Sequence, residues 1–214
     1  MKGLYIFLAI IIGYLFGCIQ TSYLIGFFRK GIDIRKHGNG NAGASNTVLV
    51  LGWKDGIIVA LCDIFKTVGA VSLMKIFMLK GGLSLNEQIL IIYLTGAFTI
   101  IGHNFPFYLK FTGGKGTASL IGLLIALDWR LATAGILSIV LTTLITGYIA
   151  LGTALLMISF TVLTYHLGFG IEATIVAVLL FLLSLYKHLP NYKRILQKEE
   201  MNLYNILRKR KEKN

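Results

Sequence analysis

The chain has 214 residues, of which 56% are hydrophobic and only 14% are charged, and its mean hydropathy is +0.75. A soluble domain usually carries about 25% charged residues, so this composition excludes an ordinary soluble protein and favours one that lies in lipid. The formal net charge is +12. The basic residues stand between and after apolar runs, which indicates contact with anionic lipid rather than with nucleic acid.

The apolar runs predict an all-α, polytopic membrane bundle of about seven transmembrane helices, because a helix that crosses the bilayer core needs about 20 apolar residues. In chain order the predicted spans are Leu4–Phe28, Gly56–Leu79, Gln88–Ile101, Thr117–Leu127, Leu131–Ile145, Tyr148–Tyr165 and Ile171–Tyr186. The shorter runs leave a count of five or six crossings open. No polar linker divides the chain, so residues 1–214 are predicted to form a single domain with a basic cytoplasmic tail from about residue 187.

The basic residues also predict the orientation in the membrane. Most of them fall in the loop after the first span, in the insert after the third span and in the tail, which ends in the basic run Arg208–Lys213. With seven spans these regions share one side, and the positive-inside rule makes that side cytoplasmic. The amino terminus is then predicted to lie outside and the carboxyl terminus in the cytoplasm.

The first polar segment, residues 33–46, is rich in glycine and asparagine. Its glycines Gly38, Gly40 and Gly43 match the spacing G-x-G-x-x-G, but they follow a membrane helix rather than a strand, which excludes a dinucleotide-binding unit. Glycines let the backbone approach a ligand closely, and a following helix N-terminus can hold an anion. Amide donors are added by Asn39, Asn41 and Asn46. A plain interfacial turn is the alternative, and it explains this density poorly.

The second polar segment, residues 102–117, lacks the spacing of a nucleotide P-loop. It nevertheless places Gly113, Gly114, Lys115 and Gly116 directly before a predicted helix, where backbone donors, the helix dipole and a lysine charge could hold phosphate. His103 is a candidate base, proton donor or hydrogen-bond donor to phosphate. The alternatives are an interfacial histidine and a lysine that serves only membrane topology.

Two further polar features complete the pattern. His188 and Asn191 follow the last predicted span, where they indicate either a third part of the site or a basic exit from the membrane. Asp63 and Lys66 stand three residues apart within a predicted span and therefore share a helix face. Intramembrane charge suggests function, but a buried pair that braces the cytoplasmic loops is slightly favoured. No metal-ligand spacing is present.

The three segments together resemble the motifs of the bacterial acyl-phosphate:glycerol-3-phosphate acyltransferases of the PlsY type. The first resembles that family's Asp-Ile-Arg…Gly-x-Gly-Asn-x-Gly-x-x-Asn loop. The second is similar in Gly102-His103-x-Phe105-Pro106 and Phe111-x-Gly113-Gly114-Lys115-Gly116, and the third in His188-x-x-Asn191 followed by Arg194. The resemblance extends from the first span to about residue 200 and implies a seven-helix bundle.

The resemblance implies transfer of a fatty acyl group from acyl-phosphate to the 1-hydroxyl of glycerol 3-phosphate. The products are lysophosphatidic acid, at the first step of phospholipid synthesis, and phosphate. It places the reaction at the cytoplasmic side of a bacterial cell membrane, with membrane lipid and an acyl-phosphate-producing enzyme as candidate partners and with no cofactor, metal or nucleic acid. The candidate catalytic residues are His103, Lys115 and Asn41. The candidate substrate- and phosphate-binding residues are Arg35, Gly38, Asn39, Gly40, Gly43, Asn46, Gly113, Gly114, Gly116, His188 and Asn191.

The sequence departs from the family pattern at three positions. Asn39 stands where the family usually has Ser, Leu49 where it has a phosphate-binding Arg, and Lys198 where the tail motif Arg-Leu-x-x-Gly-x-Glu has Gly. These departures support a second hypothesis, a divergent paralogue that acylates another polar acceptor. A third is a small membrane transporter, since glycine-broken backbone near helix ends also occurs there. Transport sites usually lie near the midplane, whereas these segments are predicted at one face.

Overall fold

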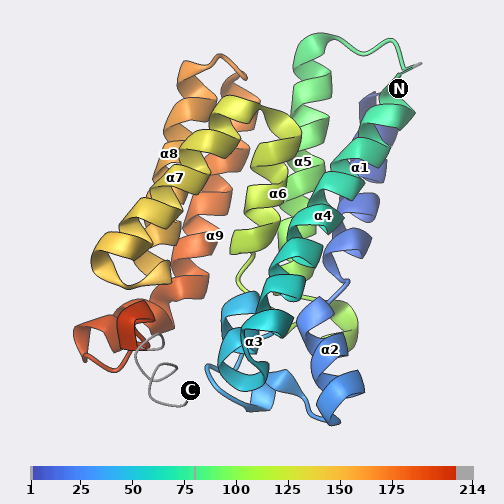
Figure 1. Ribbon diagram of the computed structural model, residues 1–214. Helices are drawn as coiled ribbons and strands as arrows, with labels where there is room; N and C mark the ends of the chain where they lie inside the picture. Colours follow the sequence, from blue (N-terminus) through green and yellow to red (C-terminus); the bar gives the residue numbers. More distant parts are fainter. Residues whose placement is uncertain (1, 80, 206–214) are drawn as a thin grey trace. The chain divides into compact units, whose positions relative to one another are not determined.

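The computed structural model describes residues 2–79 and 81–205, which form helices and no strand. The predicted all-α class is confirmed, and its cause is that a helix satisfies its own backbone hydrogen bonds in lipid. Contacts group the chain into unit 1, Met1–Leu127, and unit 2, Asp128–Asn214. Each unit is described by itself (Figure 1), and the single domain stays a prediction. The basic run Arg208–Lys213 lies outside the described residues.

Within the described residues, six helical segments are long and apolar enough to cross a membrane. They are Lys2–Lys30, Trp53–Met78, Leu85–Leu109, Trp129–Thr146, Ile149–His166 and Ile171–Leu196. The remaining predicted span, Thr117–Leu127, is a helix of 11 residues. At 1.5 Å per residue it is only about 16 Å long, about half of the bilayer core. The count of about seven crossings and the orientation stay predictions.

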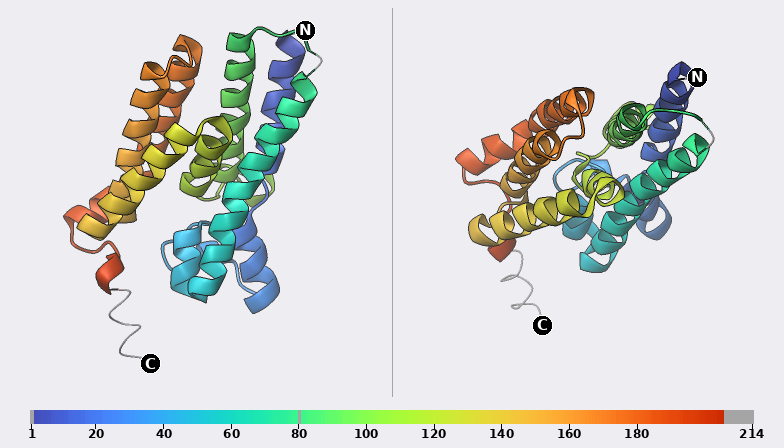
Figure 2. Two further views of the ribbon diagram at one scale, coloured as in Figure 1. Left: turned by 45° about the horizontal axis from the view of Figure 1, so that its top comes forward. Right: turned by 90° about the horizontal axis from the view of Figure 1, so that it is seen from above.

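Unit 1 is built around the long helix α4. Its elements are α1 (Lys2–Gly17), α2 (Thr21–Lys30), η1 (Ile34–Lys36), α3 (Ala44–Leu51), α4 (Trp53–Met78), α5 (Leu85–Asn104), η2 (Phe107–Leu109) and α6 (Thr117–Leu127). Helix α4 packs against α1, α3, α5 and α6. Figures 1 and 2 place α2 and α3 at one end of the unit, and the start of α1 with the α4–α5 connection at the other.

Small residues allow α1 and α5 to pack closely. A Cβ atom added at Gly17 would lie 2.9 Å from the Cα atom of Gly102, and one added at Gly102 would lie 3.1 Å from the Cα atom of Gly17. Gly13 likewise faces the backbone carbonyl of Thr95. Such close approach is typical of membrane helix pairs. It fixes the end of α5, and therefore His103, against the end of α1.

Two helices differ in their course from the predicted spans, whose limits in the membrane stay predictions. The run Leu4–Phe28 is not one helix, because the chain leaves helical geometry between Gly17 and Thr21. The helix of the last predicted span, α9, continues past Tyr186 to Leu196, with Pro190 inside it. Hydropathy did not predict the break between α1 and α2, because it does not register a helix break whose freed backbone groups find partners elsewhere in the protein.

Unit 2 is a group of three long helices, α7 (Trp129–Thr146), α8 (Ile149–His166) and α9 (Ile171–Leu196). Helix α8 packs against both α7 and α9. Asp128 caps the start of α7 by accepting a hydrogen bond from the Arg130 amide at 2.8 Å. Gly147, with φ +79°, makes the tight turn into α8, a conformation that favours glycine.

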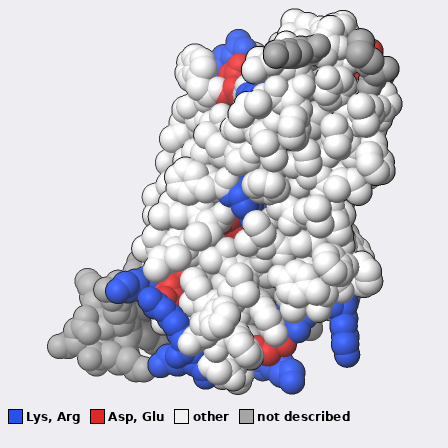
Figure 3. Space-filling model, turned by 90° about the vertical axis from the view of Figure 1, so that its right-hand side faces the viewer, with Lys and Arg blue, Asp and Glu red and all other residues white. Residues whose placement is uncertain are grey.

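Charge is concentrated at one end of unit 1. On the face drawn in Figure 3, most of the basic and acidic side chains lie at the end where α2 and α3 lie; fewer lie at the opposite end, and a small charged group interrupts the uncharged surface between the two ends. Arg29 at the end of α2 forms an ion pair with Asp55 in the first turn of α4. Near the opposite end of the unit, Lys75 in the last turn of α4 donates to the carbonyl of Ala126 at 2.6 Å, which places a cation at the end of α6.

Candidate functional site

The two glycine-rich segments of unit 1 meet. We call residues 37–43 loop A and residues 110–116 loop B. The amide of Ala42 in loop A donates to the carbonyl of Gly113 in loop B at 3.4 Å. Arg35, just before loop A, donates to the carbonyls of Leu109 and Thr112 at 2.8 and 3.1 Å. The structure therefore brings together the first two polar segments of the sequence, although about seventy residues separate them.

Arg35 acts as a clasp between the loops. Its guanidinium also donates to both carboxylate oxygens of Asp33, at 2.9 and 2.7 Å, and lies 5.4 Å from the centre of the Tyr23 ring. The hydrogen bond from Arg35 is the main cause that holds the pKa of Asp33 below 3.8, and the same bond raises the pKa of Arg35. Four hydrogen bonds occupy a group with five donors, so Arg35 has little capacity left for phosphate. Its predicted role in substrate binding stays a prediction.

Asn46 holds loop A in shape from inside. Its side chain is fully buried; its oxygen accepts from the amide of Asn39 at 2.6 Å, and its nitrogen donates to the Asn41 carbonyl at 2.8 Å. The same nitrogen also donates to the carbonyls of Ile34 and His37. Asn46 is thus a scaffold for the other loop residues. Asn41 is half-buried, and its amide nitrogen donates to the Asn39 carbonyl at 3.4 Å.

Glycine in loop A has two different causes. Gly38 and Gly40 have φ values of +58° and +70°, which strain other residues. A Cβ atom on Gly38 would in addition collide with the buried amide of Asn46. Gly43 has an extended backbone and directly precedes α3. The fold of the loop therefore requires Gly38 and Gly40, whatever ligand it binds, whereas the backbone of Gly43 is open to other residues.

Loop B folds back onto the end of α5. The amides of Gly113 and Gly114 donate to the carbonyls of Asn104 and His103 at 3.1 and 3.0 Å. These two amides therefore donate within the fold, and the predicted phosphate-binding roles of Gly113 and Gly114 stay predictions. Lys115, which is half-buried, and the start of α6 remain the candidates for phosphate binding in this segment. Gly116, with φ +84°, connects them.

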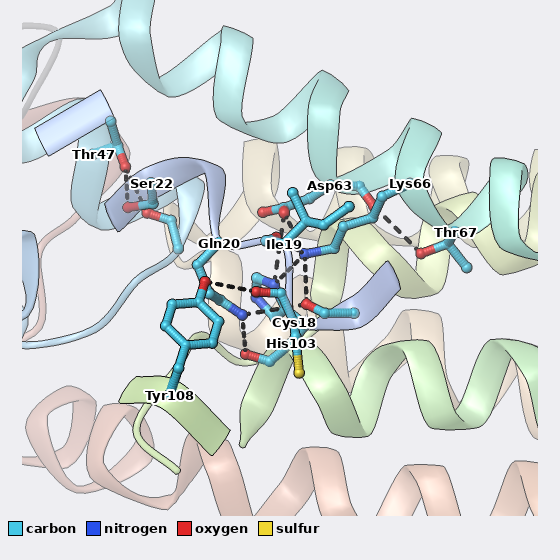
Figure 4. A network of polar contacts seen from close by, with 12 residues as sticks. Cys18, Ile19, Gln20, Ser22, Thr47, Asp63, Lys66, Thr67, His103 and Tyr108 are labelled. Carbon is cyan, nitrogen blue, oxygen red and sulfur yellow. Dashed lines mark hydrogen bonds and ion pairs between the residues drawn. The ribbon is translucent and has the colours of Figure 1, made fainter. Parts of the chain in front are cut away.

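The side chain of His103 is buried between loop B and the charged pair on α4. Its Nδ1 atom lies 2.9 Å from the ammonium of Lys66 and 3.6 Å from a carboxylate oxygen of Asp63. Lys66 and Asp63 are themselves 2.8 Å apart, and their side chains are only 4% and 2% exposed. Figure 4 shows these side chains pointing toward one another. The sequence-based pairing of Asp63 with Lys66 is confirmed, but its contact with His103 was missed.

The break between α1 and α2 supplies partners for the same cluster. Lys66 donates to the carbonyls of Gly17 and Ile19 at 3.2 and 2.8 Å. The hydroxyl of Tyr108 donates to the carbonyl of Cys18 at 2.7 Å. The side-chain amide of Gln20 donates to the carbonyl of His103 at 2.9 Å. In the sequence, the signal for this break was the polar run Gln20-Thr21-Ser22, which begins three residues after Gly17. In lipid such freed carbonyls need partners, and here side chains provide them (Figure 4).

The third polar segment lies in unit 2, on α9. Nδ1 of His188 donates to the carbonyl of Ser184 at 2.9 Å. Asn191 and Arg194 both donate to the carboxylate of Glu200 at 2.6 Å. Glu200 fixes the residues after α9 and was not singled out from the sequence. The predicted binding roles of His188 and Asn191 stay predictions.

The three departures from the family pattern have different structural settings. Asn39 shapes loop A through its backbone amide. Leu49 is a half-buried residue of α3. Lys198 has φ +59°, a left-handed conformation that favours glycine. The backbone at residue 198 therefore keeps the shape that the family's glycine would adopt.

Comparisons with known proteins are consistent with these motifs. Residues 7–198 match the family model described as Glycerol-3-phosphate acyltransferase. The chain is 48% identical to glycerol-3-phosphate acyltransferase 1 of Oceanobacillus iheyensis over 97% of this chain and 99% of the relative. It is 34% identical to glycerol-3-phosphate acyltransferase 2 of Thermotoga maritima over 91% and 95% of the two chains.

Solved structures show the same fold. The glycerol 3-phosphate form of PlsY (YgiH), an integral membrane glycerol 3-phosphate acyltransferase, matches with a TM-score of 0.82 and 27% identity. The match covers 92% of this chain and 94% of that one. The lysophosphatidic acid form of PlsY matches with a TM-score of 0.79 and 26% identity.

Proposed function

This chain belongs to the glycerol-3-phosphate acyltransferase family, and from that premise we propose that it transfers a fatty acyl group from acyl-phosphate to the 1-hydroxyl of glycerol 3-phosphate. The hydroxyl oxygen attacks the acyl carbonyl carbon and the bond from that carbon to the phosphate oxygen breaks. Lysophosphatidic acid and inorganic phosphate are the products, and the hydroxyl proton leaves with phosphate or solvent. Family membership also favours an enzyme over the transporter hypothesis.

The observation that carries the proposal is the meeting of loops A and B beside His103. Both substrates bear phosphate, and loop B adds the cation of Lys115 and the start of α6 to the side-chain amide of Asn41 in loop A. A mixed anhydride is already activated, so positioning and charge stabilisation can supply most of the rate. A protein nucleophile is unnecessary for such a reaction.

We assign different roles within the set of candidate residues. Lys115 and His103 contact the reacting phosphate and carbonyl oxygens, and Asn41 provides a nearby amide. Arg35 and Asn46 shape the loops rather than bind substrate, since their polar atoms are used within the fold. His188 and Asn191 are retained as phosphate-binding residues. Acyl-phosphate as the donor requires an acyl-phosphate-producing enzyme as a metabolic partner.

The site is proposed to face the cytoplasm. The support is the concentration of charge at the end of unit 1 that carries α2, α3 and both loops (Figure 3). Lys and Arg are enriched in cytoplasmic loops of membrane proteins. Labelling of single cysteines introduced in loop A, in intact cells and in inverted vesicles, tests this placement. Reaction in intact cells with an impermeant reagent would contradict it.

The activity is tested with the purified full-length chain, palmitoyl-phosphate and labelled glycerol 3-phosphate, with lysophosphatidic acid as the readout. Lys115→Ala and His103→Ala are expected to lower kcat by about 10²- to 10³-fold each, as the loss of one oxyanion-stabilising donor does. The matched control is Lys54→Ala, because Lys54 is an exposed lysine in the first turn of α4. Full activity in both site variants would reject the proposal.

Leu49 supports a second candidate, acylation of another polar acceptor, because this sequence lacks an arginine that the family uses for phosphate. A panel of acceptors with labelled palmitoyl-phosphate separates the two candidates. Labelling of glycerol 3-phosphate alone would exclude the second candidate. A faster reaction with another acceptor would exclude the first.

A further inference from the structure

We propose that Asp63 and Lys66 are positioning residues that hold His103 neutral, with its proton on Nε2 and directed toward loop B. His103 then donates a hydrogen bond to a phosphate or carbonyl oxygen of the substrates and does not act as a general base. The inference deepens the proposed function and rests on it for the substrate that receives the hydrogen bond. The tautomer itself can be tested without turnover.

Nδ1 of His103 has a hydrogen-bond donor as its neighbour. The ammonium of Lys66 lies 2.9 Å from this nitrogen. An ammonium has three donors and no acceptor. The contact is therefore a hydrogen bond only if Nδ1 of His103 accepts. In a neutral imidazole the other nitrogen, Nε2, must then carry the proton.

The charges of Asp63 and Lys66 already balance each other. One carboxylate, Asp63, lies 2.8 Å from one cation, Lys66, and both side chains are almost entirely buried. A protonated His103 would add a second cation beside the carboxylate of Asp63, which already faces the ammonium of Lys66. Burying an excess charge is strongly unfavourable. The neutral imidazole is the form that this environment stabilises.

Lys66 is held in place by the backbone of the helix break. Its ammonium also donates to the carbonyls of Gly17 and Ile19, which the break between α1 and α2 exposes. The two carbonyls, Nδ1 of His103 and the carboxylate of Asp63 thus surround the ammonium. Figure 4 shows these groups around the Lys66 side chain. The helix break fixes the donor, and the donor fixes the proton of His103.

The other nitrogen of His103, Nε2, lies against loop B. A Cβ atom on Gly114 would collide with Nε2 of His103, lie 2.8 Å from its Cε1 atom and lie 3.0 Å from the carbonyl oxygen of Ala42. Nε2 therefore faces loop B at the point where loops A and B meet. A protonated Nε2 can donate to an oxygen but has no lone pair to take a proton. This geometry favours charge stabilisation over base catalysis.

The experiment is ¹⁵N NMR of the full-length chain labelled at its 4 histidines, with the His103 signals identified by their loss in His103→Gln. The wild-type protein is expected to show an unprotonated Nδ1 and a protonated Nε2. Lys66→Met removes the donor and leaves Asp63 as the neighbour, so Nδ1 should become protonated. A protonated Nδ1 in the wild type, or an unchanged tautomer in Lys66→Met, would overturn the proposal.

A control separates this effect from damage to the helix break. Tyr108→Phe removes the hydrogen bond to the Cys18 carbonyl at the same break without touching His103. Its His103 signals should match those of the wild type. A tautomer change in Tyr108→Phe equal to that in Lys66→Met would show that the break, and not Lys66, sets the proton position.

Kinetics supply the second measurement. Glutamine can donate an amide N–H but cannot act as a base, so His103→Gln should keep a kcat at least about tenfold above that of His103→Ala. Lys66→Arg should recover part of the kcat lost in Lys66→Met, because arginine can still donate to Nδ1. Equal losses in His103→Gln and His103→Ala would contradict the donor role. If the wild type makes no lysophosphatidic acid, the proposed function fails while the NMR result still decides the tautomer.

Discussion

Adding one methyl group at Gly114 probes the contact between loop B and His103 directly. The new Cβ atom would lie 2.8 Å from the Cε1 atom of His103 and 3.0 Å from the Ala42 carbonyl oxygen. The same Cβ atom would collide with Nε2 of His103, and non-bonded carbon atoms pack at about 3.5–4.0 Å, so the ring or the loop must move by at least roughly 1 Å. Gly114 does not have a positive φ. The cost of Gly114→Ala is therefore steric rather than conformational.

The size of the effect follows from this overlap. Overpacking a tight site by one methyl group typically costs about 1–3 kcal/mol. About 1.4 kcal/mol in the activation free energy is a factor of ten in rate. If the strain is relieved by displacing the imidazole, kcat should fall by about fivefold to 150-fold. The melting temperature should change less, because moving the ring relieves most of the strain.

The assay measures kcat and KM of the purified variant with palmitoyl-phosphate and glycerol 3-phosphate. The matched control is Gly69→Ala on α4, where the added Cβ atom would lie 3.4 Å from the Phe16 ring, an ordinary contact. Alanine is also the better helix former by about 1 kcal/mol. The control should therefore keep full activity and gain slightly in stability.

A double variant decides whether the ring is the cause. In the His103→Ala background, the methyl group of Gly114→Ala has no imidazole to displace, so the second substitution should change the residual kcat by less than about twofold. An equal effect of Gly114→Ala with and without the ring would refute the steric explanation. So would a single variant whose kcat is unchanged.

The remaining predictions concern residues around the site and in unit 2. Leu49→Arg should lower the KM for glycerol 3-phosphate about tenfold or more, because one charge-assisted hydrogen bond contributes about 1.5–3 kcal/mol. Asp33→Asn should lower the free energy of unfolding by about 1–2 kcal/mol at pH 7. The folded pKa of Asp33 lies below 3.8. The difference in unfolding free energy between the wild type and Asp33→Asn should therefore be present above pH 3.8 and disappear as the pH falls through the folded pKa. Lys198→Gly should stabilise unit 2 by about 1 kcal/mol, because Lys198 has φ +59°.

Each of these has its own control. Leu49→Met retains size without charge and should leave KM unchanged; an equal effect of methionine and arginine would exclude phosphate binding. Thermal melts of Asp33→Asn at several pH values would contradict the clasp if the difference persisted at acid pH. Lys198→Ala keeps the unfavourable φ and should give no gain, and equal stabilisation by alanine and glycine would exclude backbone strain as the cause.

The sequence by itself determined the helical class, the residue types of both loops and the chemistry they suggest. Each of these depends on local properties: the length of an apolar run, or the glycines that a tight loop before a helix needs. The charged pair Asp63 and Lys66 could also be paired from spacing alone, because three residues nearly complete one helical turn. The resemblance of the motifs then indicated the family.

Only the tertiary structure decided how these groups are used. It commits Arg35 and Asn46 to the loops, breaks the first predicted span between Gly17 and Thr21, and joins His103 to Lys66. The bond between Tyr108 and Cys18 joins residues 90 positions apart. Such contacts depend on which helix faces pack together, and a buried polar group binds whichever partner that packing supplies. Local pattern cannot specify that choice, because it emerges only when the helices have assembled.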